Sequence, residues 1–133
     1  MNEIVEFEKA KVMKIFEGMG FECSVLNNGF IAKQSGAWTI VTILQDKYDE
    51  LQMYTFLTAK PNINKNSFLA AINLYNTKTT LTSLKLDNEG TPCLVRVLPC
   101  RGGFARQQLI QLVQEGNKEI STFLPATMVD FIE

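Results

Sequence analysis

The stretch of sequence that decides the fold is WTIVTILQDKYDELQMYTFLTA, residues 38–59. Trp38–Gln45 and Leu51–Ala59 are rich in β-branched, aromatic and other apolar residues, a composition that favours strands. The polar segment between them, Asp46–Glu50, is too short for a crossover helix, so the two strands must run antiparallel. This pair predicts an α+β fold with an antiparallel sheet packed with helices, and not a doubly wound parallel sheet.

The elements on either side of this pair complete one domain over residues 1–133, because no linker, repeat or low-complexity tract divides the chain. Before the central pair we predict a helix over Asn2–Met19 with Asn2 as its cap, and strands over Phe21–Leu26 and Phe30–Gln34 around the turn Asn27-Asn28-Gly29. After the pair we predict a helix from Asn64 or Asn66 to about Asn76, and strands over Thr80–Asp87 and Thr91–Pro99. A last helix runs from about Phe104 to Phe123, and Pro125 stops it. With three or four strands before the second helix, the order is α-β-β-β-α-β-β-α.

Apolar residues lie on both faces of the two central strands. In Trp38–Gln45 one face carries Trp38, Ile40 and Leu44, and the other carries Val41 and Ile43. In Leu51–Ala59 one face carries Leu51, Met53 and Leu57, and the other carries Tyr54 and Phe56. Either helices enclose both faces, or the second face meets another copy of the chain in a homodimer, or it forms a small apolar ligand cleft. We take Trp38, Tyr54 and Phe56 as a possible interaction surface.

The charge balance argues against a nucleic-acid partner. Thirteen basic and fourteen acidic residues leave a net charge of −1, whereas a protein that neutralises many phosphates needs a basic surface. Three cysteines are too few for a disulfide framework or a four-cysteine zinc site, so we expect reduced thiols in the cytoplasm. No apolar run approaches the length of a membrane span, so we expect a soluble protein with no membrane association.

The residue types needed for most catalytic sites are absent. The chain has no histidine, which removes serine and cysteine triads and the commonest metal ligand. The acidic groups around Asp46–Glu50 and at Asp87 and Glu89 fall in predicted turns, where solvation explains them. We therefore predict no enzyme activity, no catalytic residue, no metal and no cofactor.

One turn offers an alternative. Arg101-Gly102-Gly103 leads into the start of the last predicted helix, with Arg106 one turn further, and this arrangement could bind a small anion in a sensor or an enzyme. A plain connecting turn is the preferred interpretation. Cys100 beside it could have a lowered pKa, although a buried and inert thiol is the better explanation.

Gly116 lies on the core-facing stripe of the last predicted helix. A glycine there costs about 1 kcal/mol relative to alanine. Two explanations stay open, namely close approach of a neighbouring element and neutral drift.

From the second helix onward the sequence resembles the YbjN-like family of bacterial sensory-transduction regulators. The resemblance rests on Ala71-Ile72-Asn73-Leu74-Tyr75-Asn76, on Leu84-Lys85-Leu86-Asp87-Asn88-Glu89-Gly90, on Gly102-Gly103, and on Leu109, Leu112 and Phe123 in the last helix. It implies the fold of the type III secretion chaperones, whose element order is the one derived above. It also implies regulation or protein binding, often as a homodimer, and no catalytic residues.

Together these observations predict a non-catalytic, cytoplasmic regulator or adaptor that binds protein and acts as a homodimer. One alternative is a chaperone for an extended peptide or secretion substrate, which would pair with a strand edge. The other is the small-anion sensor or enzyme built on Arg101–Arg106. Secretion chaperones are typically acidic and this chain is nearly neutral, so the regulator or adaptor is preferred.

Overall fold

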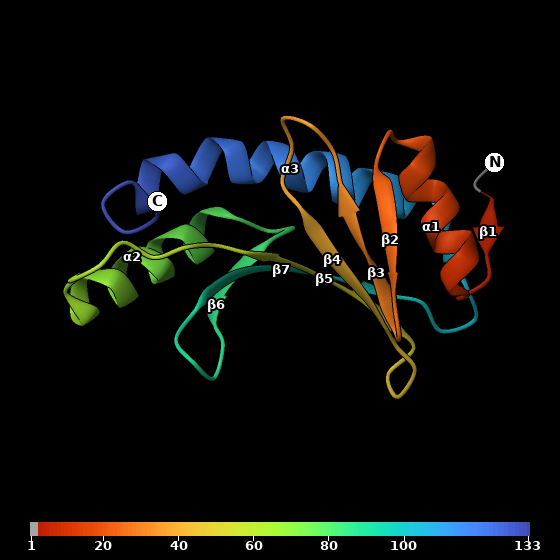
Figure 1. Ribbon diagram of the computed structural model, residues 1–133, viewed down its shortest axis with the longest axis horizontal. Coiled ribbons are helices and arrows are strands. Elements are labelled where there is room, and N and C mark those ends of the chain that lie inside the picture. Colours follow the sequence, from red (N-terminus) through yellow and green to blue (C-terminus); the bar gives the residue numbers. More distant parts are fainter. Residues whose placement is uncertain (1–2) are drawn as a thin grey trace.

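The computed structural model describes residues 3–133 as a layer of helices packed on one antiparallel sheet (Figure 1). The elements are β1 (Ile4–Val5), α1 (Lys9–Gly18), β2 (Glu22–Leu26), β3 (Gly29–Lys33), β4 (Ile40–Gln45), β5 (Glu50–Phe56), α2 (Lys65–Lys78), β6 (Ser83–Leu86), β7 (Pro92–Pro99), β8 (Phe104–Ala105) and α3 (Arg106–Met128). Asn64 caps α2 by accepting a hydrogen bond from the backbone N–H of Ser67, as predicted.

The main sheet has six strands in the order β2-β3-β4-β5-β7-β6 over the described residues, and all neighbours are antiparallel. The predicted class, the antiparallel pairing of the central strands and the hairpin around Asn27-Asn28-Gly29 are confirmed. A second, two-stranded ladder of β1 and β8 was not predicted, because two-residue strands carry no periodic signal.

Both ends of the chain differ from the prediction. The first helix begins at Lys9, because Ile4 and Val5 pair with β8 instead, and the predicted cap Asn2 lies outside the described residues. The last helix passes Pro125 and ends at Met128. Proline removes one helical hydrogen bond, but burial of Leu124 and Met128 in the core stabilises the continuing turn.

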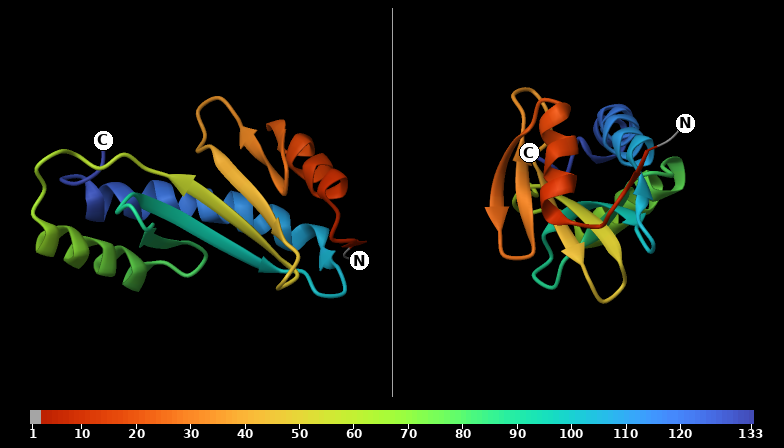
Figure 2. Two further views of the ribbon diagram at one scale, coloured as in Figure 1. Left: turned by 60° about the horizontal axis from the view of Figure 1, so that its bottom comes forward. Right: turned by 90° about the vertical axis from the view of Figure 1, so that its right-hand side faces the viewer.

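All three helices of the described residues cover the same face of the six-stranded sheet (Figures 1 and 2). The side chains beneath them form two clusters, and α3 contributes to both. The first cluster includes Val12, Ile15, Phe16, Phe30, Ile40, Met53, Leu109 and Val113, and the second includes Phe68, Ile72, Tyr75, Leu84, Leu94, Ile120 and Leu124. The alternative in which helices enclose both faces of the sheet is therefore wrong.

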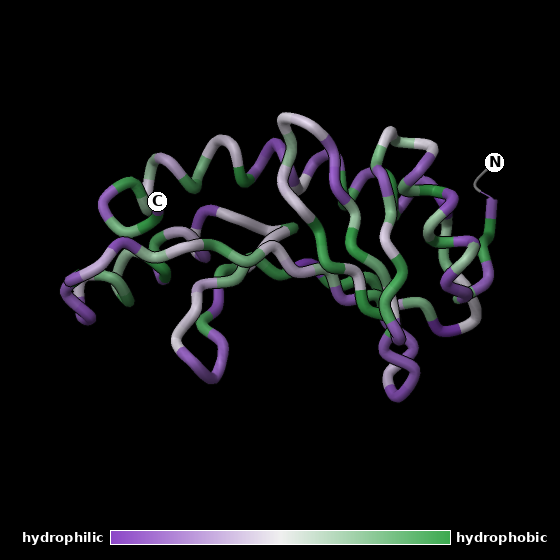
Figure 3. Tube along the Cα trace, in the orientation of Figure 1, coloured by the Kyte–Doolittle hydropathy of each residue, from purple (hydrophilic) through white to green (hydrophobic). Residues whose placement is uncertain are grey.

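The hairpin tips are polar, as Figure 3 shows for the β4–β5 and β6–β7 turns. Asp87 Oδ1 accepts hydrogen bonds from the backbone N–H groups of Glu89 and Thr91, at 2.9 and 2.8 Å. These acidic residues shape turns at the surface, which agrees with the solvated interpretation of their carboxylates.

A buried arginine joins the sheet to α3. The side chain of Arg96 in β7 is 2% exposed, and its guanidinium donates to the backbone carbonyl of Val113 at 2.9 Å and to Asn117 Oδ1 at 2.6 Å. Burial lowers the pKa of Arg96 to about 10, so the group stays charged at neutral pH. A Cβ atom at Gly116 would lie 3.1 Å from Nη1 of Arg96, so this glycine makes room for the guanidinium. Close approach, and not drift, explains Gly116.

We expect Gly116→Ala to lose the gain of about 1 kcal/mol that alanine normally brings to a helix, because the new methyl group crowds Arg96. In an Arg96→Met background the crowding is relieved, and the same substitution should stabilise the protein by about that amount. Urea unfolding of the four proteins in the double-mutant cycle measures the difference. Equal effects of Gly116→Ala in both backgrounds would show that the two residues are not coupled.

Candidate functional site

The face of the sheet without helices carries an apolar groove of about 470 Å³, which we call the open-face groove. It is lined by Val41, Ile43, Tyr54, Phe56, Cys93 and Val95, with Lys85, Leu86 and Asp87 of the β6–β7 hairpin at its rim. A cavity of this size lies in the range of ligand and side-chain binding sites. Its apolar lining departs from the expectation that an exposed sheet face is polar.

Strand alternation places Tyr54 and Phe56 in this groove. Their neighbours Met53 and Thr55 point to the helices and are buried, so Tyr54 and Phe56 point away from them. The two rings stack with centroids 6.2 Å apart, and Phe56 is 55% exposed. The Tyr54 hydroxyl donates to Gln52 Oε1 at 2.7 Å, which makes the face polar toward the far end of β5.

Trp38 lies elsewhere. It precedes β4 and packs against the second core cluster on the helix side, so the structure brings only Tyr54 and Phe56 together. Sequence reasoning did not include Cys93 and Val95, which come from β7. Their alternation with Leu94 in the predicted strand Thr91–Pro99 was the signal that could have placed them on this face.

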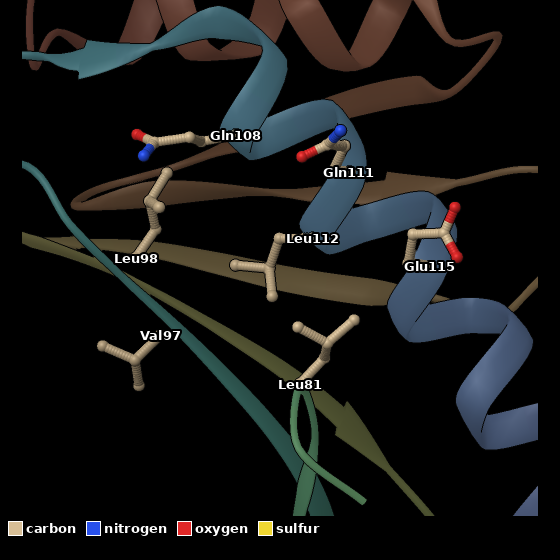
Figure 4. A pocket seen from close by; sticks show the side chains of 7 residues that line it. All are labelled: Leu81, Val97, Leu98, Gln108, Gln111, Leu112 and Glu115. Carbon is tan, nitrogen blue, oxygen red and sulfur yellow. The ribbon is translucent and has the colours of Figure 1, made fainter.

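A second hollow lies on the helix side of the sheet, between β7 and α3 (Figure 4). We call it the edge groove; its volume is about 490 Å³. In Figure 4 the side chains of Leu98 and Leu112 face each other across it, and Leu81 closes one end. Gln108, Gln111 and Glu115 of α3 form the polar rim.

The carboxylate of Glu119 on α3 holds the segment just before β6. It accepts hydrogen bonds from the backbone N–H groups of Thr80, Leu81 and Thr82, and from the Thr82 hydroxyl at 2.7 Å. Burial opposes ionisation of Glu119, but these hydrogen bonds outweigh it and hold its pKa below the ordinary value. Because the Thr82 hydroxyl donates to the carboxylate, the Tyr75 hydroxyl donates to Thr82.

In the arginine turn each of the two guanidinium groups lies near one carboxylate. Arg101 faces Asp49, with Nε 3.9 Å from Oδ2, and Arg106 faces Glu3 at 3.9 Å. The backbone N–H of Arg106 donates to the carbonyl of Glu3 at 2.8 Å. Gly102 and Gly103 have φ angles of 75° and 98° and shape the turn. The plain connecting turn accounts for these contacts.

The described residues contain no cluster of metal-ligating side chains. Within residues 3–133 no three His, Cys, Asp or Glu side chains lie close enough to share a metal ion. Cys100 is 1% exposed and burial raises its pKa to about 11, so the idea of a lowered pKa is wrong. No helix in this part of the chain is both long and apolar enough to cross a membrane.

Solved structures share this architecture at low sequence identity. The crystal structure of YbjN from E. coli matches with a TM-score of 0.74 and 14% identity, over 98% of this chain and 99% of that one. A HopA1–SchA chaperone–effector complex matches with a TM-score of 0.57 and 15% identity, over 91% of this chain and 90% of that one. The Yersinia pestis type III secretion chaperone SycH, in complex with a fragment of YscM2, matches with a TM-score of 0.58 and 14% identity, over 86% of this chain and 98% of that one.

The fold is thus that of the type III secretion chaperones. The chain belongs to the YbjN family, whose model matches residues 11–127 and is described as "Putative bacterial sensory transduction regulator". The resemblance read from the C-terminal half therefore holds over both halves. No curated protein sequence matches the chain significantly.

The alkylation rates of the three cysteine thiols test the burial of Cys93 and Cys100. Burial raises the pKa of Cys93 to about 11, as it does for Cys100, so both thiols should react slowly at neutral pH. Cys23 is half-buried and should react first. Alkylation followed by mass spectrometry should label one cysteine quickly and the other two only on unfolding. Fast labelling of Cys100 in the folded protein would contradict this assignment.

Glu119 should make stability depend on acid. Its folded-state pKa lies below the ordinary value of 4.5, so its contribution is complete above the unfolded-state pKa and is lost as pH falls through the folded-state pKa. We expect Glu119→Gln to lower the free energy of unfolding at neutral pH and to reduce its further loss toward about pH 3. Glu115→Gln is the control, because Glu115 contacts the exposed Lys118. An equal acid dependence in wild type and Glu119→Gln would refute the role.

Proposed function

We propose that this chain is a non-catalytic regulator or adaptor of the cytoplasm, which binds protein and acts as a homodimer through its open-face groove. The observation that carries the proposal is the uncovered face of the six-stranded sheet, with Phe56 at 55% exposure among apolar neighbours. Large apolar surfaces on a folded protein usually mark sites of association.

The chemistry of the groove suits a protein surface. Its lining is aliphatic and aromatic, and its charged residues, Lys85 and Asp87, lie at the rim. An apolar centre with a polar rim is the usual anatomy of a protein interface. The solved structures of similar fold include a chaperone bound to an effector and a chaperone bound to a protein fragment, which supports protein as the class of partner.

A second copy is the simplest occupant of the groove. In a two-fold dimer the same patch meets itself, so Tyr54 and Phe56 of one protomer would pack on the corresponding groove of the other. Stacked aromatic rings bring a large contact area with few rotatable bonds, which suits the centre of an interface.

The oligomeric state tests this proposal. We expect the wild-type chain to have the mass of a dimer and Phe56→Glu to have the mass of a monomer, by light scattering after gel filtration, because a buried carboxylate would be left unpaired in the interface. Phe56 is exposed, so the protomer should keep its fold, which circular dichroism checks.

Val25→Glu is the matched control. Val25 is 63% exposed on β2 and pairs with Phe30, whose side chain lies under the helices, so it is outside the open-face groove. Its variant should remain dimeric. A monomeric wild type, or a Phe56→Glu variant as dimeric as the wild type, would sink the proposal.

A further inference from the structure

The backbone of β7 has a gap in its pairing at Val97. Successive residues of a strand direct their N–H and C=O groups to opposite sides. The carbonyl of Pro92 accepts from the N–H of Leu57 at 3.0 Å, so even-numbered residues of β7 bond toward β5. The N–H of Asp87 donates to the carbonyl of Thr91 at 2.9 Å, so odd-numbered residues bond toward β6. The N–H and C=O of Val97 therefore point toward the β6 side.

On that side the partner strand ends too early. The β6–β7 ladder begins at the pair Ser83–Val95, and two residues further the same register would bring Leu81 opposite Val97. The N–H of Leu81 instead donates to Glu119, which draws this segment toward α3. No residue of the described range 3–133 bonds the N–H or C=O of Val97, and its side chain is 43% exposed.

The neighbouring outward backbone groups of β6, at Leu84, are covered. The side-chain amide of Asn76 donates to the carbonyl of Leu84 at 2.9 Å, and its oxygen accepts from the N–H of Leu84 at 2.7 Å. Leu84 is one of two residues of β6 whose backbone groups face away from β7, the other being Leu86, and Asn76 takes the place of a further strand at Leu84. Unpaired strand edges are normally protected in this way. The edge beside Val97 lacks such a cover and borders the edge groove.

If another extended chain paired with β7 at Val97, the edge groove would accommodate one of its side chains. A residue opposite Val97 would point to the open face, and the residue opposite Leu98 would point to the helix side, between Leu98 and Leu112. Gln108 and Gln111 at the rim supply donors and acceptors above it. An aliphatic side chain at that one position matches the apolar floor.

A second copy does not fit this edge through its own β7. A two-fold axis at Val97 would bring the Pro99 of the other copy opposite Val95, and Ser83 already holds that position. A single extended segment that stops short of Ser83 meets no such obstacle.

We infer that the edge of β7 at Val97 binds an extended segment of a partner protein, which adds a strand to the sheet and places an aliphatic side chain in the edge groove. The inference rests on the proposed function as a protein-binding module, and it concerns a different surface from the open-face groove. The affinity comes from main-chain hydrogen bonds to Val97 and the selectivity from the groove.

The probe is a phage-displayed library of random linear dodecapeptides, selected on the immobilised full chain. The best binder is then synthesised and its affinity measured by fluorescence anisotropy. We expect it to carry an aliphatic residue in an alternating pattern, and to bind Val97→Pro at least about tenfold more weakly, because proline removes the N–H donor. In the wild type, hydrogen exchange of the Val97 amide should slow about tenfold or more on binding.

Val25→Pro is the matched control, because the register of β2 directs the N–H of Val25 away from β3, at the opposite edge of the sheet. This variant should bind the peptide as the wild type does. Amide exchange uses the wild-type protein, so it decides the question even if Val97→Pro does not fold. Failure to select any peptide, equal binding to Val97→Pro, or an unprotected Val97 amide in the complex would overturn the inference. The mass of the Phe56→Glu variant by light scattering tests the proposed homodimer, and its outcome does not depend on these results.

Discussion

The buried guanidinium of Arg96 is the constraint around which the rest of the structure is arranged. A charge removed from water must be hydrogen-bonded, and here the partners are the backbone of α3 at Val113 and the side chain of Asn117. Those partners exist only when α3 crosses β7 at one place, with Gly116 against the guanidinium. Apolar packing alone would tolerate sliding of a helix over a sheet, whereas these directional bonds specify one position.

With α3 placed in this way, the two core clusters follow on either side of Arg96. α1 fills one cluster with Val12, Ile15 and Phe16, and α2 fills the other with Phe68, Ile72 and Tyr75. Residues 3–133 contain no further helix that covers the second face of the sheet. The open-face groove is thus a consequence of all three helices packing on one face, and it leaves Tyr54 and Phe56 without a helix over them.

At the β6 edge of the sheet, side chains of the helices bond the backbone. Asn76 on α2 pairs with Leu84 as a strand would, and Glu119 on α3 gathers the backbone amides before β6. Asn76 is also one of the residues by which the sequence resembles its family, and the structure gives it a physical role. Both contacts shape the surface beside Val97, because they decide where the β6–β7 ladder stops.

The sequence by itself determined the strands of the main sheet and the antiparallel pairing of its hairpins, because turn lengths and strand composition are local properties that the chain carries in any context. It also placed Tyr54 and Phe56 on one face, since alternation needs only the strand. The tertiary structure decided which face the helices cover, why Pro125 does not end α3, and why Trp38 lies apart from the other two aromatic residues. It alone revealed the contact of Gly116 with Arg96 and the unpaired edge at Val97, because these depend on residues brought together from distant parts of the chain.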